Sequence, residues 1–334
     1  MQSFIVSEAQ KALVLNPASP QMLCNLLPMA KPFEFRGHTL YAVPHDVDVV
    51  RLLRNVGVTA PSPILHQYTW PGKYTPFQAQ RATAEFLTLN PRAFCLNDMG
   101  TGKTQATMWA YDYLRAAGKR RRMLVVAPLS TLERTWGDTI FANFPHLTFT
   151  VLHGSRERRL KLLNHPFDVY IINHDGVQII AKELEKRDDI DVIVIDEIAV
   201  LRNSATDRYK AMAKVCEPLE RVVWGLTGTP IPNEPTDAWA QIRLVDPTRV
   251  PKYFGRFRDM DVDADRRDRN LDLELPLDQL VGIGLGQEQG LEFGQPPFRN
   301  PQGERPLGPV EIQVTAEATP LTADQFVAMH RLAV

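Results

Sequence analysis

A glycine-rich segment at residues 97–104 has the residue types of a phosphate-binding loop. It reads Asn-Asp-Met-Gly-Thr-Gly-Lys-Thr, follows a short apolar run at 93–96 and precedes a stretch with helical spacing. In such loops, backbone N–H groups at a helix N-terminus surround phosphate oxygens, and glycines permit the close approach. Lys103 is expected to reach the phosphates and the Thr104 hydroxyl to ligate Mg²⁺. The predicted nucleotide-binding set here is Gly100, Thr101, Gly102, Lys103 and Thr104, although Asn97 replaces the first glycine of the full motif.

A pair of acidic residues, Asp196 and Glu197, follows another apolar run at 192–195. A carboxylate at the end of a strand is where nucleotide-bound Mg²⁺ needs an acidic partner, so Asp196 joins Thr104 in the predicted metal site. Glu197 can accept a proton from an attacking water, as a general base does. We expect the strand that ends at Asp196 to lie beside the strand that precedes the phosphate loop. The predicted catalytic set is therefore Lys103, Asp196 and Glu197.

Each of these two segments also has a plainer interpretation. The glycine-rich segment could be a helix-entry turn with an incidental lysine, and the acidic pair could lie in a solvated loop. Their occurrence together in one chain favours nucleotide hydrolysis.

A third segment, Leu-Thr-Gly-Thr-Pro at residues 226–230, ends the last apolar run. The small side chains of Thr227, Gly228 and Thr229 at a strand end could sense a phosphate site and relay its state. A turn with side chain-to-backbone hydrogen bonds is the alternative.

The elements that must position these residues alternate between two kinds. Apolar runs recur at 93–96, 123–127, 149–152, 169–173, 192–195 and 222–226, with helix-like stretches at 103–117, 131–143, 156–163 and 209–217. Runs without polar alternation indicate strands buried on both faces of a sheet that helices cover. We predict an α/β fold with a mostly parallel, doubly wound sheet, whose ligands lie at the carboxyl ends of the strands.

The chain divides into three stretches. Residues 1–70 are Pro-punctuated, with a short hairpin expected at 33–43 and a helix at 46–56, and form a small α+β appendage. Residues 71–250 form the α/β domain. Residues 251–334 include an alternating charge run and a Gly-, Gln- and Pro-rich part, which are typical of an irregular linker or tail.

Composition argues against a wholly disordered chain and against a small disulfide-stapled scaffold. With 44% hydrophobic residues and a net charge of −1, the chain has enough apolar residues for a core and no bulk charge to attract nucleic acid. Its three cysteines fit neither a disulfide framework nor a zinc site. No signal peptide and no apolar run of about 20 residues is present. We therefore expect an intracellular protein, cytoplasmic or associated with the nucleoid or nucleus, with no membrane partner.

The ordered motifs resemble the first motor lobe of superfamily-two helicases, specifically the Swi/Snf-type DNA-translocating ATPases, over residues 75–247. The resemblance implies a RecA-like P-loop NTPase fold with ATP and Mg²⁺ as cofactors. Thr-Pro-Phe-Gln at 75–78 is similar to an adenine-reading motif, which implies that Gln78 binds the base. Thr-Gly-Thr-Pro at 227–230 resembles the family's coupling motif in its Swi/Snf form, which favours double-stranded DNA.

Two further segments, 126–132 followed by Trp136, and 168–175, resemble motifs on the nucleic-acid side of the family. The resemblance implies DNA contacts by Pro128, Ser130, Thr131, Asn173 and His174.

Two departures from the family pattern qualify the expected activity. Ala199 stands where the family has a histidine that links nucleotide state to the coupling motif. No second set of strands with an arginine-bearing motif follows Pro247, so we hypothesise a truncation before a second RecA-like lobe. The expected function is an ATP-dependent motor on double-stranded DNA. The alternatives are a half-motor that binds Mg·ATP but needs a second lobe from a longer product or a partner chain, and a non-catalytic interaction module.

Two basic runs and two aromatic residues have weaker interpretations. Residues 119–122 are typical of a solvated loop, with phosphate contact as the alternative. Arg156, Arg158, Arg159 and Lys161 are expected on the exposed face of a helix. For Trp70 and Tyr74, packing is favoured over stacking on adenine.

Overall fold

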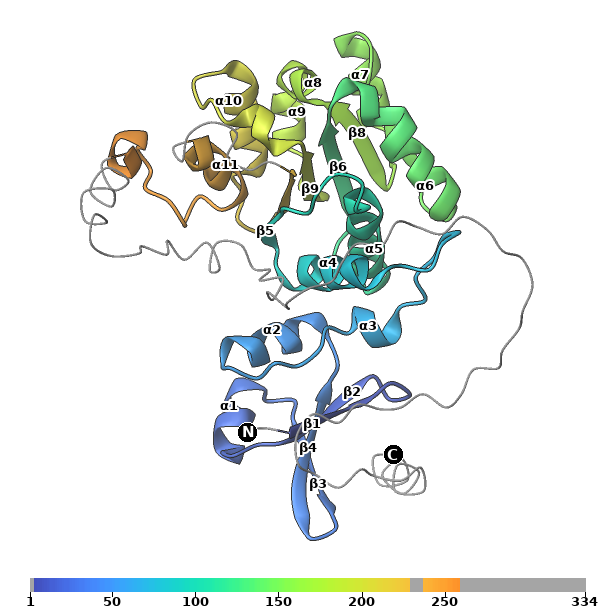
Figure 1. Cartoon of the computed structure of the whole chain (residues 1–334), viewed down its shortest axis with the longest axis vertical. Helices are drawn as coiled ribbons and strands as arrows, with labels where there is room; N and C mark the ends of the chain where they lie inside the picture. Colours follow the sequence, from blue (N-terminus) through green and yellow to red (C-terminus); the bar gives the residue numbers. More distant parts are fainter. Residues whose placement is uncertain (1–2, 229–236, 259–334) are drawn as a thin grey trace, which may run out of the picture. The chain divides into compact units, whose positions relative to one another are not determined.

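The computed structural model describes residues 3–228 and 237–258. They belong to two compact units that divide between Ala60 and Pro61 (Figure 1). Of the predicted residues, Thr229 and nearly all of the expected tail lie outside the described residues. No helix of the described residues is long and apolar enough to cross a membrane.

The N-terminal unit is an antiparallel sheet with two helices. Its elements are β1 (Ser3–Ser7), β2 (Ala12–Asn16), α1 (Pro20–Leu26), β3 (Lys31–Phe35), β4 (His38–Pro44) and α2 (Val47–Asn55), and the strand order is β1-β2-β4-β3. Arg36 and Gly37 both have positive φ, as a two-residue hairpin turn requires, and this turn joins β3 to β4 at the predicted hairpin. Asp46 caps α2 by accepting a hydrogen bond from Asp48 N at 2.8 Å. None of the predicted site residues lies in this unit.

The second unit is built on a six-stranded sheet in which every adjacent pair is parallel. Its strands are β5 (Arg92–Cys95), β6 (Arg122–Ala127), β7 (Phe149–Val151), β8 (Val169–Asn173), β9 (Ile190–Asp196) and β10 (Val222–Leu226). The order β5-β10-β9-β6-β8-β7 and the helices around the sheet confirm the predicted parallel α/β fold.

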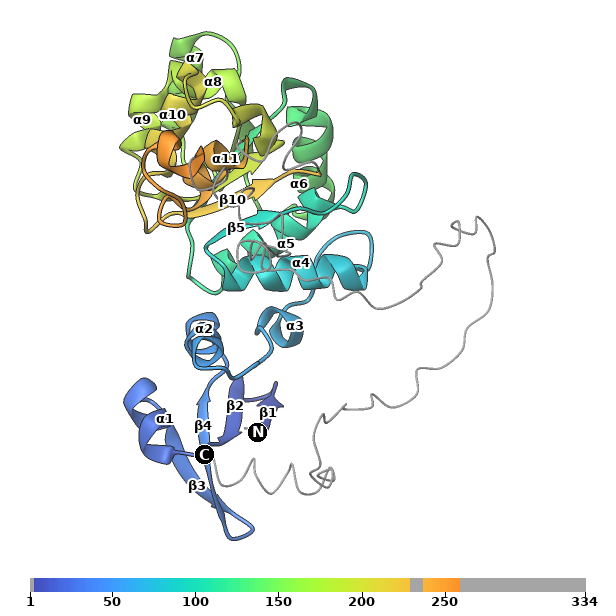
Figure 2. The same ribbon diagram turned by 60° about the vertical axis from the view of Figure 1, so that its left-hand side comes forward.

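Helices cover both faces of this sheet. Along the chain they are α3 (Ile64–Gln67), α4 (Gln78–Leu89), α5 (Lys103–Ala116), η1 (Leu129–Thr131), η2 (Leu132–Gly137), α6 (Asp138–Asn143), α7 (Arg156–Leu163), α8 (His174–Ile179), α9 (Ala181–Glu185), η3 (Ile198–Leu201), α10 (Asp207–Cys216) and α11 (Asp237–Val245). Figure 2 shows α4 and α5 on one side of β5 and β10, with α9, α10 and α11 on the other.

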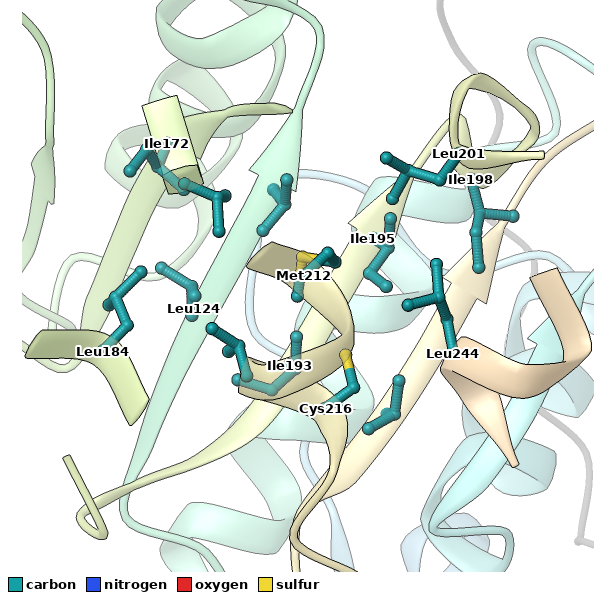
Figure 3. Close-up of a cluster of buried hydrophobic side chains, with 14 of the residues drawn as sticks. Leu124, Ile172, Leu184, Ile193, Ile195, Ile198, Leu201, Met212, Cys216 and Leu244 are labelled. Carbon is teal, nitrogen blue, oxygen red and sulfur yellow. The ribbon is translucent and has the colours of Figure 1, made fainter. Parts of the chain in front are cut away.

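A hydrophobic core fills the space between the sheet and α8 to α11. Ile193 and Ile195 of β9 and Leu124 of β6 pack there against Met212 of α10 and Leu244 of α11, all at most 1% exposed (Figure 3). Because successive residues of a buried strand point to opposite faces, Val192 and Val194 of β9, also fully buried, serve the other face. This two-sided burial explains the uninterrupted apolar runs in the sequence.

The strand order corrects one expectation. We expected the strand ending at Asp196 to lie beside the strand before the phosphate loop, but β10 lies between them, with Leu226 opposite Cys95 on one side and Asp196 on the other. Hydrophobic patterning identifies strands but carries no information on which strands are neighbours. It therefore could not show that β10, which follows β9 in the chain, lies between β5 and β9 in the sheet.

The segment after Pro61 packs on the α/β unit. Tyr68 Oη donates to Asp112 Oδ2 at 2.5 Å, and Trp109 Nε1 of α5 donates to Pro71 O at 2.8 Å. The Trp70 ring meets those of Tyr68 and Trp109 edge-on. Trp70 therefore packs against α5, as we expected. Because these contacts tie the segment to α5, the boundary between the two units lies ten residues before the expected position near 70.

Candidate active site

The predicted phosphate loop connects β5 to α5, with two residues in the left-handed conformation that favours glycine. Gly100 has φ +76° and Gly102, which caps α5, has φ +82°. The loop folds back on itself, since Thr101 Oγ1 donates to Asp98 O at 2.8 Å and Lys103 Nζ donates to Asn97 O at 2.7 Å and Asp98 O at 3.0 Å. No acidic residue occupies the first turn of α5. The helix dipole, the lysine and the turn together make this end attractive to an anion.

Two side chains of α4 hold the loop in place. Gln80 accepts a hydrogen bond from Phe77 N at 3.0 Å through Oε1 and donates to Thr101 O at 3.2 Å through Nε2. A Cβ at residue 102 would collide with the Gln80 amide, so any other side chain there displaces the end of Gln80, and the left-handed φ itself favours glycine. The base of the loop is held by Asn97 Nδ2, which donates to Thr83 Oγ1 at 2.8 Å.

Gln80 and Thr83 were missed by the sequence reasoning. The signal that could have found Gln80 is its position three residues after the helix cap, where a glutamine side chain reaches back to the cap N–H. The predicted adenine contact, Gln78, is the first residue of α4 and its side chain is exposed.

Asp196 ends β9, and each of its three oxygens accepts a hydrogen bond. Oδ2 accepts from Trp136 Nε1 at 2.9 Å, Oδ1 from Glu197 N at 3.1 Å, and the carbonyl oxygen from His174 Nε2 at 2.9 Å. Burial raises the pKa of Asp196 above its ordinary value, while the bond from Trp136 and the charge of Lys103 oppose this shift. The carboxylate is therefore desolvated but fixed in orientation.

Glu197 has φ +49°, a conformation rare for a residue with a side chain. It stands between β9 and η3, where the chain leaves the sheet. Backbone strain of this kind costs about 1–3 kcal/mol and is concentrated at functional sites.

The third predicted segment lies between the other two. Thr227 follows β10, is fully buried, and its backbone N donates to Cys95 O of β5 at 3.1 Å. A Cβ at Gly228 would lie 3.6 Å from Met99 N and 3.7 Å from Asn97 O, so this glycine lies against the phosphate loop. The structure thus brings Thr227 and Gly228 together with both other segments at one edge of the sheet.

The segments predicted to contact DNA form adjoining loops at the same edge, because Ala127 of β6 pairs with Asn173 of β8. Ser130 is exposed, while Thr131 is half-buried and donates from Oγ1 to Pro128 O at 3.0 Å. His174 differs from its neighbours in this set. It is 7% exposed, and burial lowers its pKa, so a neutral ring donates from Nε2 to the Asp196 carbonyl. His174 therefore joins β8 to β9 beneath the loop surface.

Arg159 corrects the expectation of an exposed basic helix face. Arg156 and Arg158 are exposed, but Arg159 is 5% exposed and its guanidinium donates to Gly154 O at 3.0 Å and to Leu152 O, with Asn173 Oδ1 at 3.5 Å. Burial lowers the pKa of Arg159. The expectation rested on residue type, which could not show that Arg159 packs under the loops of β7 and β8.

The chemistry of the site fits magnesium that arrives with a nucleotide. Among the described residues, no group of three or more His, Cys, Asp or Glu side chains is arranged to hold a metal ion by itself. Mg²⁺ at nucleotide sites typically takes only one or two protein oxygens, with phosphates and water completing its shell. The Thr104 hydroxyl and the Asp196 carboxylate are hard oxygen donors of this kind.

Comparisons with known proteins identify a family and relatives for this α/β unit. A sequence model of the family described as SNF2-related domain matches residues 90–274, just over half of the chain. The chain is 30% identical over 195 residues to SWI/SNF-related matrix-associated actin-dependent regulator of chromatin subfamily A-like protein 1 of Xenopus laevis, covering 57% of this chain and 18% of that protein. It is 29% identical to putative protein p41 of Acyrthosiphon pisum secondary endosymbiont phage 1, covering 52% of this chain and 39% of p41.

A solved structure shares the fold. The Sulfolobus solfataricus SWI2/SNF2 ATPase core in complex with dsDNA superposes with a TM-score of 0.50 at 24% identity, covering 57% of this chain and 39% of that one. The chain thus spans well under half the length of each of these proteins.

Proposed function

Since the chain belongs to the family of SNF2-related domains, as its motifs predicted, we propose that it carries the ATP-binding lobe of a DNA-dependent ATPase that acts on double-stranded DNA. One observation carries the proposal. The phosphate loop, the Asp196–Glu197 pair and Thr227–Gly228 come from strands β5, β9 and β10, which are neighbours in the sheet and end at the same edge. Ligands of parallel α/β sheets bind at this edge.

The roles of the residues follow from their chemistry. Lys103 pairs with the phosphates in the nest formed by Gly100, Thr101 and Gly102, and Gln78 contacts the adenine. Thr104 and Asp196 hold Mg²⁺, which when bound neutralises negative charge on the phosphates. Glu197 accepts the proton of the attacking water.

The assignment of duplex DNA as partner rests on the loops at the same edge. Ser130 and Thr131 after β6, and Asn173 at the end of β8, offer small polar side chains and backbone groups suited to phosphate contacts, with Pro128 shaping the turn. His174 supports this surface from below. Of the similar proteins, the Sulfolobus core was solved with dsDNA. We propose movement along the duplex without a requirement for strand separation.

A second candidate function is a half-motor, and it is favoured by the presence of a single parallel sheet in the described residues. The described residues contain one parallel sheet, whereas the resemblance implies a second lobe that supplies arginines. Such an arginine contributes roughly 10³ to 10⁵ in turnover. On this proposal the chain binds Mg·ATP, and rapid hydrolysis needs a second lobe from a longer product or a partner chain.

One experiment tests both candidates. Nucleotide binding and ATP turnover are measured with and without duplex DNA for the wild-type chain, Lys103→Ala and Glu197→Gln. Binding lost in Lys103→Ala supports a nucleotide site, and turnover stimulated by DNA and lost in Glu197→Gln supports the motor. Binding without turnover supports the half-motor. If the wild-type chain and Lys103→Ala bind nucleotide equally poorly, the chain is a non-catalytic interaction module and the proposal fails.

A further inference from the structure

We propose that Trp136 is a positioning residue that sets the orientation of the Asp196 carboxylate toward the metal. Through Trp136, a movement of the exposed loop at residues 129–131 on DNA binding also reaches this carboxylate. The inference deepens the proposed function and rests on it. Its basis is the hydrogen bond of 2.9 Å from Trp136 Nε1 to Asp196 Oδ2, between residues 60 positions apart in the chain.

The bond leaves the carboxylate with one preferred plane. Glu197 N donates to Oδ1 at 3.1 Å and the Trp136 indole donates to Oδ2, so each oxygen has one donor. A carboxylate offers about four lone-pair sites, so each oxygen retains capacity for a metal ion or its water. Without the indole N–H, only the Glu197 bond would remain, and rotation about the side chain would be free to turn the second oxygen away.

Trp136 differs from the other buried tryptophans of the same unit. Trp109, Trp224 and Trp239 donate to backbone carbonyls, those of Pro71, Asn90 and Pro251, at 2.8, 3.0 and 2.9 Å. Trp136 instead donates to a carboxylate, and hydrogen bonds to charged acceptors are roughly twice as strong as neutral ones. The pairing with an ionisable acceptor at the predicted metal site is not required for packing, since the other three achieve burial without it.

The helix that carries Trp136 has an unusual form. Residues Leu132–Gly137 form a π-helix turn, a rare form that occurs frequently at functional sites. Trp136 is fully buried there, and a Cβ on Gly137 would lie 3.4 Å from the Phe149 ring of β7. The wider turn thus directs the indole inward to β9 while its neighbour packs closely on β7.

The same short segment reaches the surface at its other end. Leu129 is 60% exposed and Ser130 is exposed, and η1 continues directly into η2. About one helical turn therefore separates the proposed DNA-contacting residues from the indole that holds Asp196. Because the connection is a continuous helical backbone, a shift of the loop on DNA binding moves the donor of the carboxylate.

The test measures the Mg²⁺ concentration at which binding of a fluorescent ADP analogue is half-maximal, in the full chain. Trp136→Phe removes the N–H and keeps an aromatic ring, and Trp224→Phe is the matched control with the same loss of volume and of one N–H. Removing a group that orients a metal ligand typically costs 10- to 100-fold in metal affinity. We expect Trp136→Phe to raise the half-saturating Mg²⁺ concentration about tenfold or more, with unchanged nucleotide affinity in EDTA, and Trp224→Phe to match the wild type.

Two outcomes overturn the positioning role. One is an equal Mg²⁺ requirement for both variants, and the other is loss of nucleotide affinity in EDTA for Trp136→Phe, which would show a structural role. If Trp136→Phe does not fold, β-(3-benzothienyl)alanine at residue 136 keeps the shape of the indole and replaces the N–H by sulfur. The same Mg²⁺ shift is expected from it, and a wild-type requirement in this variant overturns the role.

Duplex DNA tests the link to the loop. DNA is expected to change the Mg²⁺ requirement of the wild type and of Trp224→Phe but not that of Trp136→Phe. An equal change in all three, or none in a wild-type chain that binds DNA, overturns the link. Failure of the proposed function is distinguishable, because then the wild-type chain does not bind nucleotide better than Lys103→Ala at any Mg²⁺ concentration.

Discussion

Replacing Gly102 by alanine tests the phosphate loop at its most constrained position. Gly100 and Gly102 have nearly the same left-handed φ, +76° and +82°, but different surroundings. A Cβ at Gly100 meets nothing within 4 Å, whereas one at Gly102 collides with the amide of Gln80. Gly100→Ala is therefore the matched control that reports the backbone cost alone.

The expected magnitudes follow from these contacts. An L-residue held in the left-handed conformation costs about 1–2 kcal/mol, which is the expected loss for Gly100→Ala. In Gly102→Ala the Gln80 side chain must also move, and its hydrogen bonds to Phe77 N and Thr101 O break. Both bonds are solvent-exposed, so at the lower end of about 0.5–1.5 kcal/mol each they add about 1 kcal/mol. We expect Gly102→Ala to cost about 2–3 kcal/mol in the free energy of unfolding.

The assay is urea denaturation followed by tryptophan fluorescence. All five tryptophans lie between residues 70 and 239, so the signal reports the α/β unit. In a Gln80→Ala background the extra cost of Gly102→Ala should vanish, leaving the cost seen for Gly100→Ala. If Gly102→Ala costs the same in both backgrounds, the contact between Gln80 and the loop does not hold the loop as described, and the reasoning is refuted.

Three further predictions concern single side chains. Arg159→Met is expected to cost about 2–4 kcal/mol in stability because the buried Leu152 O and the part-buried Gly154 O lose their donor. The exposed Arg158→Ala should change stability by less than about 0.5 kcal/mol; equal effects in urea denaturation would contradict the buried position of Arg159. Bonds from Arg187 hold the pKa of Asp189 at about 2, below its ordinary 3.8. Because solvent screens this partly exposed pair, it contributes about 1 kcal/mol of stability, which is present above about pH 4 and is lost as the pH falls toward 2. Asp189→Asn should therefore flatten the stability profile between pH 4 and 2, and an unchanged slope would exclude the pairing. Glu197→Gln should retain nucleotide affinity and remove turnover; unchanged turnover would exclude Glu197 as the base.

The two main segments of the site could be identified from the sequence because each is built from contiguous residues. A phosphate-binding turn is built from contiguous residues, so the spacing of Gly100, Gly102, Lys103 and Thr104 could be identified without knowing the fold. The acidic pair was identified in the same way, from its place directly after an apolar run. The structure locates both at the carboxyl edge of the sheet, as expected for a parallel α/β fold.

The groups that hold these segments in place belong to other parts of the chain. Gln80 from α4, Trp136 from η2 and His174 from the start of α8 each bond a site residue, and none carries a local signal for its acceptor. Arg159 resembles its exposed neighbours in residue type and differs from them only in what packs over it. Such contacts depend on strand order and helix packing, which hydrophobic periodicity does not encode.

The sequence alone predicted the six strands of the sheet, the parallel α/β class and the residues that we propose bind phosphate and metal, because burial on both faces and turn chemistry are properties of short contiguous segments. The tertiary structure decided that β10 enters between β5 and β9, and this placement puts Thr227 and Gly228 between the phosphate loop and Asp196. Strand order results from the packing of the whole sheet, in which residues more than a hundred positions apart become neighbours.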